Sequence, residues 1–542
     1  MFIWYEQYIL LNKEMTNDHK KIKTALISVY NKKKIVELAQ GLQKKNIEIF
    51  TTNNTENFLK KNNITTTNVS KITKYPEILN GKIKTLHPKI FAGILGNRKE
   101  NHNTIKQYNI PIIDLIVINF YPLENIENHI KFENNIDIGG PAMVRAAAKN
   151  HKNTIIITNI SDYDYILNVI NTTHSFTIME RLKFAKKAFE YTLNYEFLAL
   201  KMFNKKINTI EGKNQDLLPK KLYIKYHKKQ NLKYGENPDQ KSALYFQKNN
   251  KNRNIDNFKQ LNGTDLSYNN IYDANIAYDC VNQFNEPSCV IIKHGNPCGA
   301  SISNNITDAY SNAYNSDPVS AFGGIIGFNK IINKDVIIKI IKNQFVELII
   351  GPEINLDALN YIKKNKNIKI LICGNYKKKN VSKIEIKSIN NSLLIQEVNN
   401  QKEEYQNWEV VSKKKPTEQE KKYAKFSWKI SKFVKSNAIV YTHKYNIISI
   451  GSGQTNRIEA VKIANQKYQL NVNRLKIKNK NIIMTSDAFF PFRDSIDECM
   501  KNNNQISCII QPGGSIRDNE VIDAVNQYNI CMIFTKKRIF KH

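Results

Sequence analysis

Short apolar runs alternate with amphipathic stretches along most of this chain. In the first half, apolar runs predict buried strands at 25–29, 47–50, 112–120 and 155–158. Apolar residues at helical spacing predict helices at 35–45, 56–61, 142–149 and 178–204. This alternation is typical of an α/β fold with a parallel sheet.

The second half repeats the alternation over a longer stretch. Strands are predicted at 289–293, 325–328, 347–350, 367–372, 438–441, 447–450, 482–485, 507–510 and 531–534. Helices are predicted between some of them, notably at 426–436, 456–465 and 519–528. The pattern favours parallel or mixed sheets covered by helices on both faces, and no short-period repeat is evident.

A stretch rich in Lys, Asn, Gln and Pro at roughly 205–220 separates the halves and has the composition of a linker. We therefore expect an N-terminal extension at 1–19, a first domain at 20–218 and a second domain at 219–542. The first 18 residues are apolar but lack a cationic start and a small-residue cleavage site, so they do not read as a signal peptide. A K-K-K-P-T run at 413–417 is interpreted as an internal joint of the second domain.

The chain is strongly basic, with a formal net charge of +33. Its lysines are spread along the chain rather than clustered, and no nucleic-acid-reading motif accompanies them, so a nucleic-acid-binding protein is the disfavoured alternative. A basic surface would still attract substrates that carry phosphate or carboxylate groups.

The seven cysteines are scattered, with no C-x-x-C pair and no zinc-ligand spacing. This pattern predicts a reducing compartment and no bound metal. No apolar run reaches the length of a membrane span, so we expect a cytoplasmic protein without membrane contacts.

Two motifs in the first half point to anion chemistry. In K-I-K-T-L-H-P at 82–88, strand alternation would place Lys82 and Lys84 on one face beside Thr85, an arrangement that suits a phosphate or oxyanion. The alternative is an exposed lysine edge that prevents aggregation. The motif D-I-G-G-P at 137–141 leads into a helix N-terminus, where free N–H groups attract anions, although Asp137 could simply cap that helix.

The central candidate is C-V-I-I-K-H-G-N-P-C-G at 289–299. Its apolar run predicts a buried strand, and G-N-P-C-G is expected to end that strand in a turn. Lys293 and His294 would then lie at the strand end, where a base beside an ammonium group forms a plausible proton-transfer pair. The alternative is a histidine that only caps the strand.

Three further segments carry weaker signals. The Gly-rich turns S-A-F-G-G at 320–324 and Q-P-G-G-S-I-R-D at 511–518 would let backbone approach a ligand, but such turns are common. The segment S-D-A-F-F-P-F-R-D at 486–494 could form the wall of a pocket for a flat heteroaromatic ring, or a core corner with one ion pair.

Together these segments resemble one family in order and spacing, the bifunctional enzymes of purine biosynthesis that join an AICAR transformylase to an IMP cyclohydrolase. The resemblance runs from about residue 24 to the C-terminus and includes K-T-L-H-P, I-D-I-G-G-P, R-A-A-A-K-N-H, Y-G-E-N-P, L-S-Y-N-N, K-H-G-N-P-C-G, S-A-F-G-G-I-I, F-V-K-S-N-A-I-V-Y, S-D-A-F-F-P-F-R-D and Q-P-G-G-S-I-R-D.

The resemblance implies an α/β chain of two domains. The N-terminal domain would have a methylglyoxal-synthase-like parallel sheet, and the transformylase would be built from cytidine-deaminase-like units. The family works as an intertwined homodimer with 10-formyltetrahydrofolate as co-substrate and no bound cofactor. A deaminase zinc motif is incomplete here because position 301 is Ser and no H-x-E or C-x-E partner precedes it, so no zinc is expected.

For the transformylase, the resemblance implies formyl transfer to the 5-amino group of AICAR ribotide. His294 would be the base, and Lys293 would stabilise the oxyanion or keep the histidine neutral. Asn437 matches an amide near the formyl oxygen. The matching substrate positions are Lys233, Tyr234, Phe322, Gly323, Glu347, Arg457, Phe489, Phe492, Asp494 and Phe540.

For the cyclohydrolase, the resemblance implies dehydrative ring closure of the formylated ribotide to IMP. The matching catalytic positions are Lys84, Tyr121, Asp137 and Lys149. Ser28, Lys32 and Thr85 match nucleotide contacts, and Lys82 occupies a further position of this kind.

Several positions depart from the family pattern. The S-T-G-G-T phosphate turn is replaced by T-T-N-N-T at 51–55, in which we expect Asn53 and Asn54 to tolerate a positive φ. Lys82 and Lys233 replace Arg and lose its bidentate geometry, and Asp239 stands where the family usually has His. We expect weaker nucleotide affinity in the cyclohydrolase but retained chemistry. The alternative is a transformylase with a decayed cyclohydrolase domain.

Overall fold

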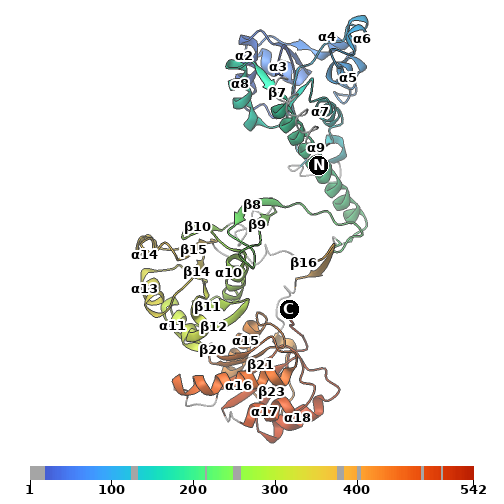
Figure 1. Cartoon of the computed structure of the whole chain (residues 1–542). Coiled ribbons are helices and arrows are strands. Elements are labelled where there is room, and N and C mark those ends of the chain that lie inside the picture. Colours follow the sequence, from blue (N-terminus) through green and yellow to red (C-terminus); the bar gives the residue numbers. More distant parts are fainter. Residues whose placement is uncertain are drawn as a thin grey trace, which may run out of the picture. The chain divides into compact units, whose positions relative to one another are not determined.

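The computed structural model describes residues 19–123, 132–213, 216–247, 258–374, 384–398, 405–475, 477, 481–501 and 505–542. The chain forms two compact units, residues 1–216 and 217–542, and each is considered by itself (Figure 1). Residues 1–18 of the extension predicted at 1–19 lie outside the described residues, and His19 begins β1 (His19–Lys21).

The first unit is built on a five-stranded, fully parallel sheet with the order β4-β3-β2-β5-β6. The strands are β2 (Thr24–Val29), β3 (Glu48–Thr51), β4 (Thr67–Asn68), β5 (Leu115–Asn119) and β6 (Ile155–Ile157). The chain moves from β2 to β3 on one side and later returns to β5 on the other. Ligands of open α/β sheets bind at such a switch point, beyond the carboxyl ends of the strands.

Alternation along β2 divides the core of this unit into two layers. Ala25 and Ile27 pack with α2 (Ile35–Lys44) and α8 (Tyr163–Asn171), whereas Leu26 faces the opposite layer. That second layer is covered by α5 (Pro88–Leu95), α7 (Gly139–Lys149) and the long helix α9 (Ile178–Ile210). The remaining elements are β1 (His19–Lys21), α3 (Asn53–Lys60), α4 (Val69–Thr73), α6 (His102–Gln107) and β7 (Ser175–Thr177).

Three local predictions for the first unit need correction. Residues 82–88 do not form a strand, because an isolated bridge between Ile78 and Ile83 closes a turn there, and Pro88 begins α5. The predicted strand at 112–120 is shortened to β5. Helix α9 continues to Ile210, into the stretch interpreted as a linker.

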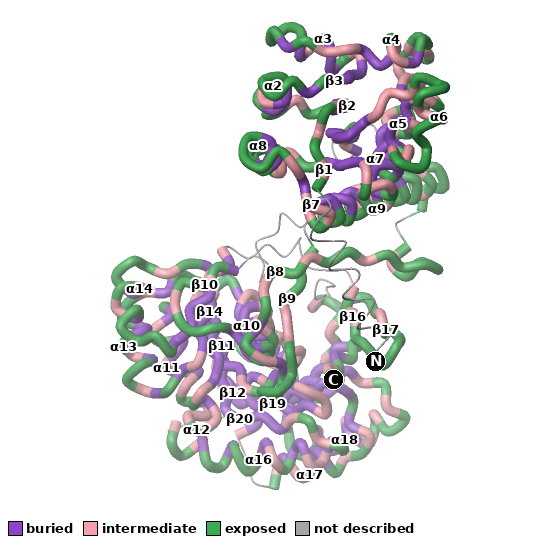
Figure 2. Tube along the Cα trace, turned by 45° about the horizontal axis from the view of Figure 1, so that its top comes forward, coloured by how far each residue is buried: buried purple, intermediate pink, exposed green. Residues whose placement is uncertain are grey.

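The second unit is organised by one mixed sheet of twelve strands. Its order is β10-β15-β14-β13-β11-β12-β20-β19-β21-β22-β23-β18. The bounds are β10 (Lys259–Asn262), β11 (Ser288–Lys293), β12 (Asn296–Ile302), β13 (Ile325–Phe328), β14 (Leu348–Gly351), β15 (Lys369–Ile372), β18 (Glu409–Val410), β19 (Ile439–His443), β20 (Asn446–Gly451), β21 (Ile482–Ser486), β22 (Ile506–Gln511) and β23 (Cys531–Phe534). These strands form the buried centre of the unit (Figure 2).

The sheet is two copies of one arrangement joined between β12 and β20. In the first half, the β11–β12 hairpin is followed by the parallel run β13, β14 and β15. In the second half, the β19–β20 hairpin is followed by β21, β22 and β23 in the same sense. A helix precedes each hairpin, α10 (Tyr268–Val281) and α15 (Glu418–Ser431), and both helices are 14 residues long and begin with a capping box.

Further helices cover both faces of the sheet (Figure 1). They are α11 (Ile306–Ser316), α12 (Pro318–Ala321), α13 (Lys334–Asn343), α14 (Leu356–Ile362), α16 (Arg457–Arg474), α17 (Asp494–Lys501) and α18 (Asp518–Gln527). Two small hairpins complete the unit, β8 (His227–Leu232) with β9 (Ser242–Phe246) and β16 (Ile384–Ile389) with β17 (Ser392–Glu397).

Two predictions for the second unit are wrong in detail. The segment G-N-P-C-G does not end the strand, because Asn296–Ile302 forms β12, and Pro297 lies where the register with β11 shifts, a position at which a strand tolerates proline. The helix predicted at 426–436 begins eight residues earlier at Glu418, because Thr417 caps it, and it ends at Ser431.

Two properties bear on the broad class of the protein. Among the described residues, no helix combines the length and hydropathy required to cross a bilayer. The seven cysteines are all free, and six of them are buried.

Candidate active sites

In the first unit, predicted nucleotide-binding residues gather at the carboxyl end of β2. The Ser28 hydroxyl lies 3.2 Å from the hydroxyl of Thr52, which follows β3. The Lys32 ammonium donates to Thr55 Oγ1 at 3.0 Å and also to the carbonyl oxygen of Val29. These contacts join the ends of two neighbouring parallel strands, where the topology predicts a ligand.

Lys32 is an unusual lysine because it is partly desolvated and near another cation. Burial, and secondarily the charge of Lys84, lowers the pKa of Lys32 to about 8. A bound dianion would offset the repulsion between Lys32 and Lys84 and would stabilise the charged form of both lysines.

The segment T-T-N-N-T forms a different turn from the one expected. Thr52 is the N-cap of α3, and Asn53 and Asn54 lie in its first turn without a positive φ. The two asparagines therefore need no left-handed backbone, and the N-terminus of α3, with its free N–H groups, begins two residues after the end of β3.

The K-I-K-T motif brings its residues together through a tight turn. Gly81 has φ 84°, and a Cβ there would lie 3.0 Å from Glu77 Oε1. Glu77 pairs with the Lys84 ammonium at 3.6 Å. Thr85 is buried against α7, since a Cβ on Gly139 would lie 2.9 Å from Thr85 Oγ1. Lys82 lies in the turn between them, with its N–H bonded to the carbonyl of Leu79.

Asp137 caps the N-terminus of α7 and lies within the influence of the Lys84 charge. Its Oδ1 accepts the N–H of Gly140 at 2.8 Å, and its own N–H donates to the Tyr195 hydroxyl at 2.8 Å. Burial raises the pKa of Asp137, while the Gly140 N–H and the charge of Lys84 act in the opposite direction. A carboxylate with these partners has raised basicity and a nearby ammonium, as a proton-transfer group requires.

The last two predicted residues of this unit differ in their placement. Tyr121 follows β5, with its ring centroid 4.4 Å from that of Tyr30, and a hydrogen bond with Tyr121 raises the pKa of the Tyr30 hydroxyl. Lys149 occupies the last turn of α7, about 15 Å of helix rise from Gly139. The structure thus groups Lys84, Thr85 and Asp137, whereas Lys149 lies at the other end of the same helix.

In the second unit, Lys293 and His294 lie at the tip of the β11–β12 hairpin. Lys293 pairs with Asn296, so His294 and Gly295 form a two-residue turn. Their φ angles are 52° and 75°, the signature of a type I′ hairpin. The strand–turn boundary predicted from sequence is therefore present, although the chain returns as a strand.

A buried carboxylate lies beneath this turn. Asp273, on α10, accepts the Gly295 N–H at 2.9 Å. Burial raises the pKa of Asp273, and hydrogen bonds from the backbone of Gly295 and His294 and the charge of His294 oppose that effect. A Cβ on Gly295 would lie 3.1 Å from Tyr272 Cε1 and 3.5 Å from Lys435 Cε, so both side chains approach the turn closely.

The first half of the sheet brings further predicted residues to this hairpin. The Lys293 ammonium donates to the carbonyl oxygen of Phe322 at 2.7 Å. The N–H of Gly323, which has φ 72°, donates to the carbonyl oxygen of Phe345. Glu347 accepts a hydrogen bond from Asn270 at 3.0 Å and pairs with Lys369 at 3.6 Å.

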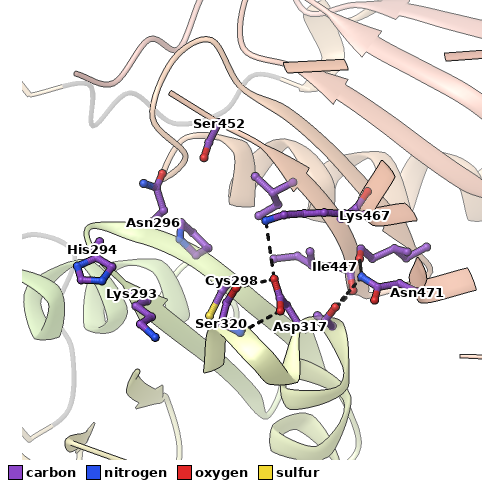
Figure 3. Close-up of a pocket in the computed structure, with 15 residues that line it drawn as sticks. Lys293, His294, Asn296, Cys298, Asp317, Ser320, Ile447, Ser452, Lys467 and Asn471 are labelled. Carbon is purple, nitrogen blue, oxygen red and sulfur yellow. Dashed lines mark hydrogen bonds and ion pairs between the residues drawn. The ribbon is translucent and has the colours of Figure 1, made fainter. Parts of the chain in front are cut away.

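A cavity of about 170 Å³ lies beside the hairpin (Figure 3). Lys293 and His294 project from the hairpin at one end of it, and Asp317 and Lys467 face each other at 3.7 Å. Residues of both halves of the sheet line this cavity, namely Lys293, His294, Asn296, Pro297, Cys298, Ser316, Asp317, Ser320, Ile447, Ile448, Ser449, Ile450, Ser452, Lys467 and Asn471. The site is thus assembled from both sequence halves.

Asn437 and Arg457 form a second polar group. The guanidinium of Arg457 donates to Asn437 Oδ1 at 2.7 Å and to Asp487 Oδ1 at 2.6 Å. Asp487 is fully buried, and it also accepts the Ser436 hydroxyl at 2.5 Å. The Arg457–Asp487 pair therefore orients the Asn437 amide, with its Nδ2 donating to the carbonyl oxygen of Gln454.

The aromatic segment divides into core and surface. Phe490 is fully buried, whereas Phe489, Phe492 and Phe540 are 39%, 46% and 41% exposed. The ion pair of this segment joins Arg493 to Asp497, not to Asp494, which begins α17. The Arg517 guanidinium lies 4.7 Å from the Phe492 ring centroid and that of Arg538 lies 4.5 Å from the Phe540 ring centroid, so these exposed rings lie beside cationic groups.

Lys233 and Tyr234 lie by the N-terminus of α10. The carbonyl oxygen of Tyr234 accepts the N–H of Tyr268, the first residue of that helix. The Lys233 ammonium is 5.4 Å from the Tyr234 ring centroid.

Sequence reasoning missed Asp273, Asp317 and Lys467. Of the three, only Asp273 has a signal in the sequence: it stands one and four residues before Ala274 and Ala277, and all three are buried on α10. Asp317 and Lys467 meet only in the folded chain. Within the described ranges, no group of three or more His, Cys, Asp or Glu side chains could hold a metal ion.

Two family models match the chain. The model described as AICARFT/IMPCHase bienzyme matches residues 147–467, and the model described as MGS-like domain matches residues 34–142. The two matches together cover most of both units.

Three relatives from Buchnera aphidicola, each described as a bifunctional purine biosynthesis protein PurH, align over nearly the whole chain. The protein from subspecies Schizaphis graminum (strain Sg) is 48% identical, over 96% of this chain and 99% of its own. That from subspecies Acyrthosiphon pisum (strain 5A) shows the same identity and coverage. That from subspecies Baizongia pistaciae (strain Bp) is 46% identical over 97% and 100%.

Proposed function

The chain belongs to the family of bifunctional purine biosynthesis proteins, with AICAR formyltransferase and IMP cyclohydrolase activities, and from this we propose which residues perform each reaction. The enzyme formylates AICAR ribotide and then closes the product to IMP. Both activities hold for the family over the full length of this chain, so a decayed cyclohydrolase domain is not the favoured interpretation.

We propose that His294 is the base of the formyl transfer. The supporting observation is its position at the hairpin tip, beside Lys293 and at one end of a cavity. The acceptor amine is conjugated with its ring and is a weak nucleophile, so a positioned base must take its proton as the C–N bond forms. Lys293, Asn437 and Arg457 would then place charge and hydrogen bonds around the formyl oxygen and the ribotide.

For the ring closure, the proposed group is Lys84, Asp137 and Tyr121, with Lys149 as a further member. Asp137 is supported by its partly desolvated carboxylate facing the Lys84 charge. It would take the proton from the attacking carboxamide nitrogen, while Lys84 holds charge on the formyl oxygen as water leaves. Ser28, Lys32, Lys82, Thr85 and the α3 N-terminus would bind the ribotide phosphate.

Substrate contacts of the transformylase are proposed for the remaining residues. These are Lys233, Tyr234, Phe322, Gly323, Glu347, Phe489, Phe492, Asp494 and Phe540. The exposed rings of Phe489, Phe492 and Phe540 are suited to stack on planar groups of the folate or ribotide. The family is folate-dependent, and we propose 10-formyltetrahydrofolate as the formyl donor.

A pair of variants of the full chain tests these assignments together. His294→Ala should abolish formyl transfer while ring closure continues, and Asp137→Asn should do the reverse. Each lost activity should fall by about 10²–10⁴-fold. The assay for ring closure supplies the formylated ribotide and follows IMP by ultraviolet absorbance.

The two variants serve as controls for one another, since each must keep the activity of the other unit. If His294→Ala left formyl transfer within about twofold of wild type, a residue other than His294 would be the base. The same outcome for Asp137→Asn would remove Asp137 from the ring closure.

We also propose a homodimer and a cytoplasmic location, as the resemblance implies. Sedimentation velocity should give twice the chain mass of 62.8 kDa. A monomer with full transformylase activity would contradict the proposal.

A further inference from the structure

The turn that carries His294 requires a left-handed backbone at a residue other than glycine. His294 has φ 52°, a left-handed conformation that non-glycine residues adopt at a cost and that persists only where neighbours enforce it. In a two-residue hairpin the N–H groups of the two turn residues are not part of the strand ladder. A hydrogen bond from outside the hairpin would therefore stabilise this turn.

Asp273 supplies that support from a different element. It lies 22 residues before Gly295, on α10, and its carboxylate accepts the N–H of Gly295 at 2.9 Å. Asp273 is 9% exposed, and its helix also contributes Ala274, Ala277 and Tyr278 to the hydrophobic core. A carboxylate in such a place is unfavourable unless it is hydrogen-bonded, so its presence needs a reason beyond packing.

The second half of the sheet shows that the fold itself does not need this carboxylate. Asp273 is the sixth residue of α10, and the sixth residue of the equally long α15 is Tyr423. Gly295 is the second residue of its hairpin turn, and the second residue of the β19–β20 turn is Tyr445. Tyr423 and Tyr445 pack edge-to-face with centroids 5.1 Å apart. The same two positions are thus joined by an aromatic contact in the half whose turn carries no predicted base.

We propose that Asp273 is a positioning residue of the transformylase: its hydrogen bond to the Gly295 N–H holds the turn so that the His294 imidazole is aimed at the acceptor amine. This inference rests on the proposed role of His294 as the base. Asp273 acts through the backbone of the turn and accepts no proton from the substrate. The proton of the acceptor amine is taken by His294 alone.

The test compares full-length Asp273→Ala and Asp273→Asn with wild type. Asp273→Ala should lower transformylase kcat by about 30–100-fold with KM for the ribotide changed less than about threefold, because a misaimed base impairs the chemical step more than binding. Asp273→Asn keeps one acceptor oxygen and should recover to within about tenfold of wild type. Hydrogen exchange in a peptide covering residues 293–297 should be faster in Asp273→Ala.

Two controls accompany these variants. Ring closure by the first unit should stay within about twofold of wild type in every variant, which reports an intact protein. Asp357→Asn, on the exposed first turn of α14, removes the same charge from the same unit and should leave both activities unchanged.

The possible outcomes distinguish a failure of the positioning role of Asp273 from a failure of the assignment of His294 as the base. If His294→Ala loses formyl transfer but both Asp273 variants keep kcat within about twofold, the positioning role is wrong and His294 stands. If His294→Ala itself keeps activity, the base assignment fails and the inference with it. If Asp273→Ala does not fold, Asp273→Asn decides: equal loss of kcat and affinity without faster exchange in the turn would mean a structural role only.

Discussion

The two halves of the second unit share one arrangement but use the hairpin tip differently. In the first half, the tip residues are His294 and Gly295, held from α10 by the Asp273 carboxylate. In the second half, they are Lys444 and Tyr445, and Tyr445 packs against Tyr423 and Phe426 of α15. One tip presents polar groups to a cavity, and the other closes a core.

This difference shows how a duplicated fold can specialise through one pair of contacts. Both tips begin with a residue in the left-handed region, His294 with φ 52° and Lys444 with φ 54°. The second turn residue differs, because Gly295 also has a positive φ of 75° whereas Tyr445 does not, so the two halves differ both in turn type and in the side chains that hold the turn. Hydrogen bonding fixes a turn while leaving its polar residues outside the core, whereas ring packing draws the turn into it.

The largest effect should come from His294→Asn. Asparagine accepts a left-handed φ well, so the turn should survive while the imidazole is removed. We expect transformylase kcat to fall by about 10³-fold. The matched variant Lys444→Asn, at the same place in the other turn, should keep kcat within about twofold. Comparable losses in both variants would show that the second tip also takes part in the reaction.

Next in size is Tyr445→Ala in the second half. This change removes ring contacts with Tyr423 at 5.1 Å and Phe426 at 6.0 Å, and we expect a loss of about 2 kcal/mol of stability. Thermal unfolding followed by tryptophan fluorescence should show a Tm lower by several degrees, with kcat little changed below that temperature. An unchanged Tm would contradict a packing role for this tip.

A smaller effect is expected for Gly295→Ala in the first half. Gly295 has φ 75°, and a Cβ there would lie 3.1 Å from the Tyr272 ring. The strain should be about 1 kcal/mol, and the displaced turn should lower transformylase kcat by about tenfold. If kcat is unchanged while Tm falls, the turn tolerates displacement, and the exact placement of the His294 imidazole is not critical for the reaction.

The smallest effect extends the comparison to the first unit, whose proposed phosphate site relies on lysine charge. The lowered pKa of Lys32, about 8, means that Lys32 is a cation below that pH and becomes neutral above it. The cyclohydrolase KM for its ribotide should therefore rise as pH increases from 7.5 to 9, by about fivefold. Steady-state kinetics across this range provide the measurement.

Lys32→Arg is the matched control for that profile, because arginine stays charged throughout the range. Its KM should be nearly independent of pH. A wild-type KM that stays flat up to pH 9 would show that Lys32 does not contribute its charge to phosphate binding.

The local sequence pattern was sufficient to predict most strands and to reveal the resemblance to the family. Apolar runs such as 325–328 and 531–534 became β13 and β23 because a strand buried on both faces needs continuous apolar residues. The order of the motifs likewise indicated both activities, since each motif is contiguous in sequence. The pairing of Lys293 with His294 at a strand end could be inferred because the apolar run stops at that point.

Only the tertiary structure decided how distant segments cooperate. G-N-P-C-G became strand β12 because β11 and β20 flank it, a pairing that local turn propensity does not reveal. The start of α15 depended on the Thr417 cap rather than on apolar periodicity. The contact between Asp273 and Gly295 crosses 22 residues, and the Asp317–Lys467 pair joins the two halves. Such contacts depend on the packing of whole elements, and no local periodicity of the chain encodes them.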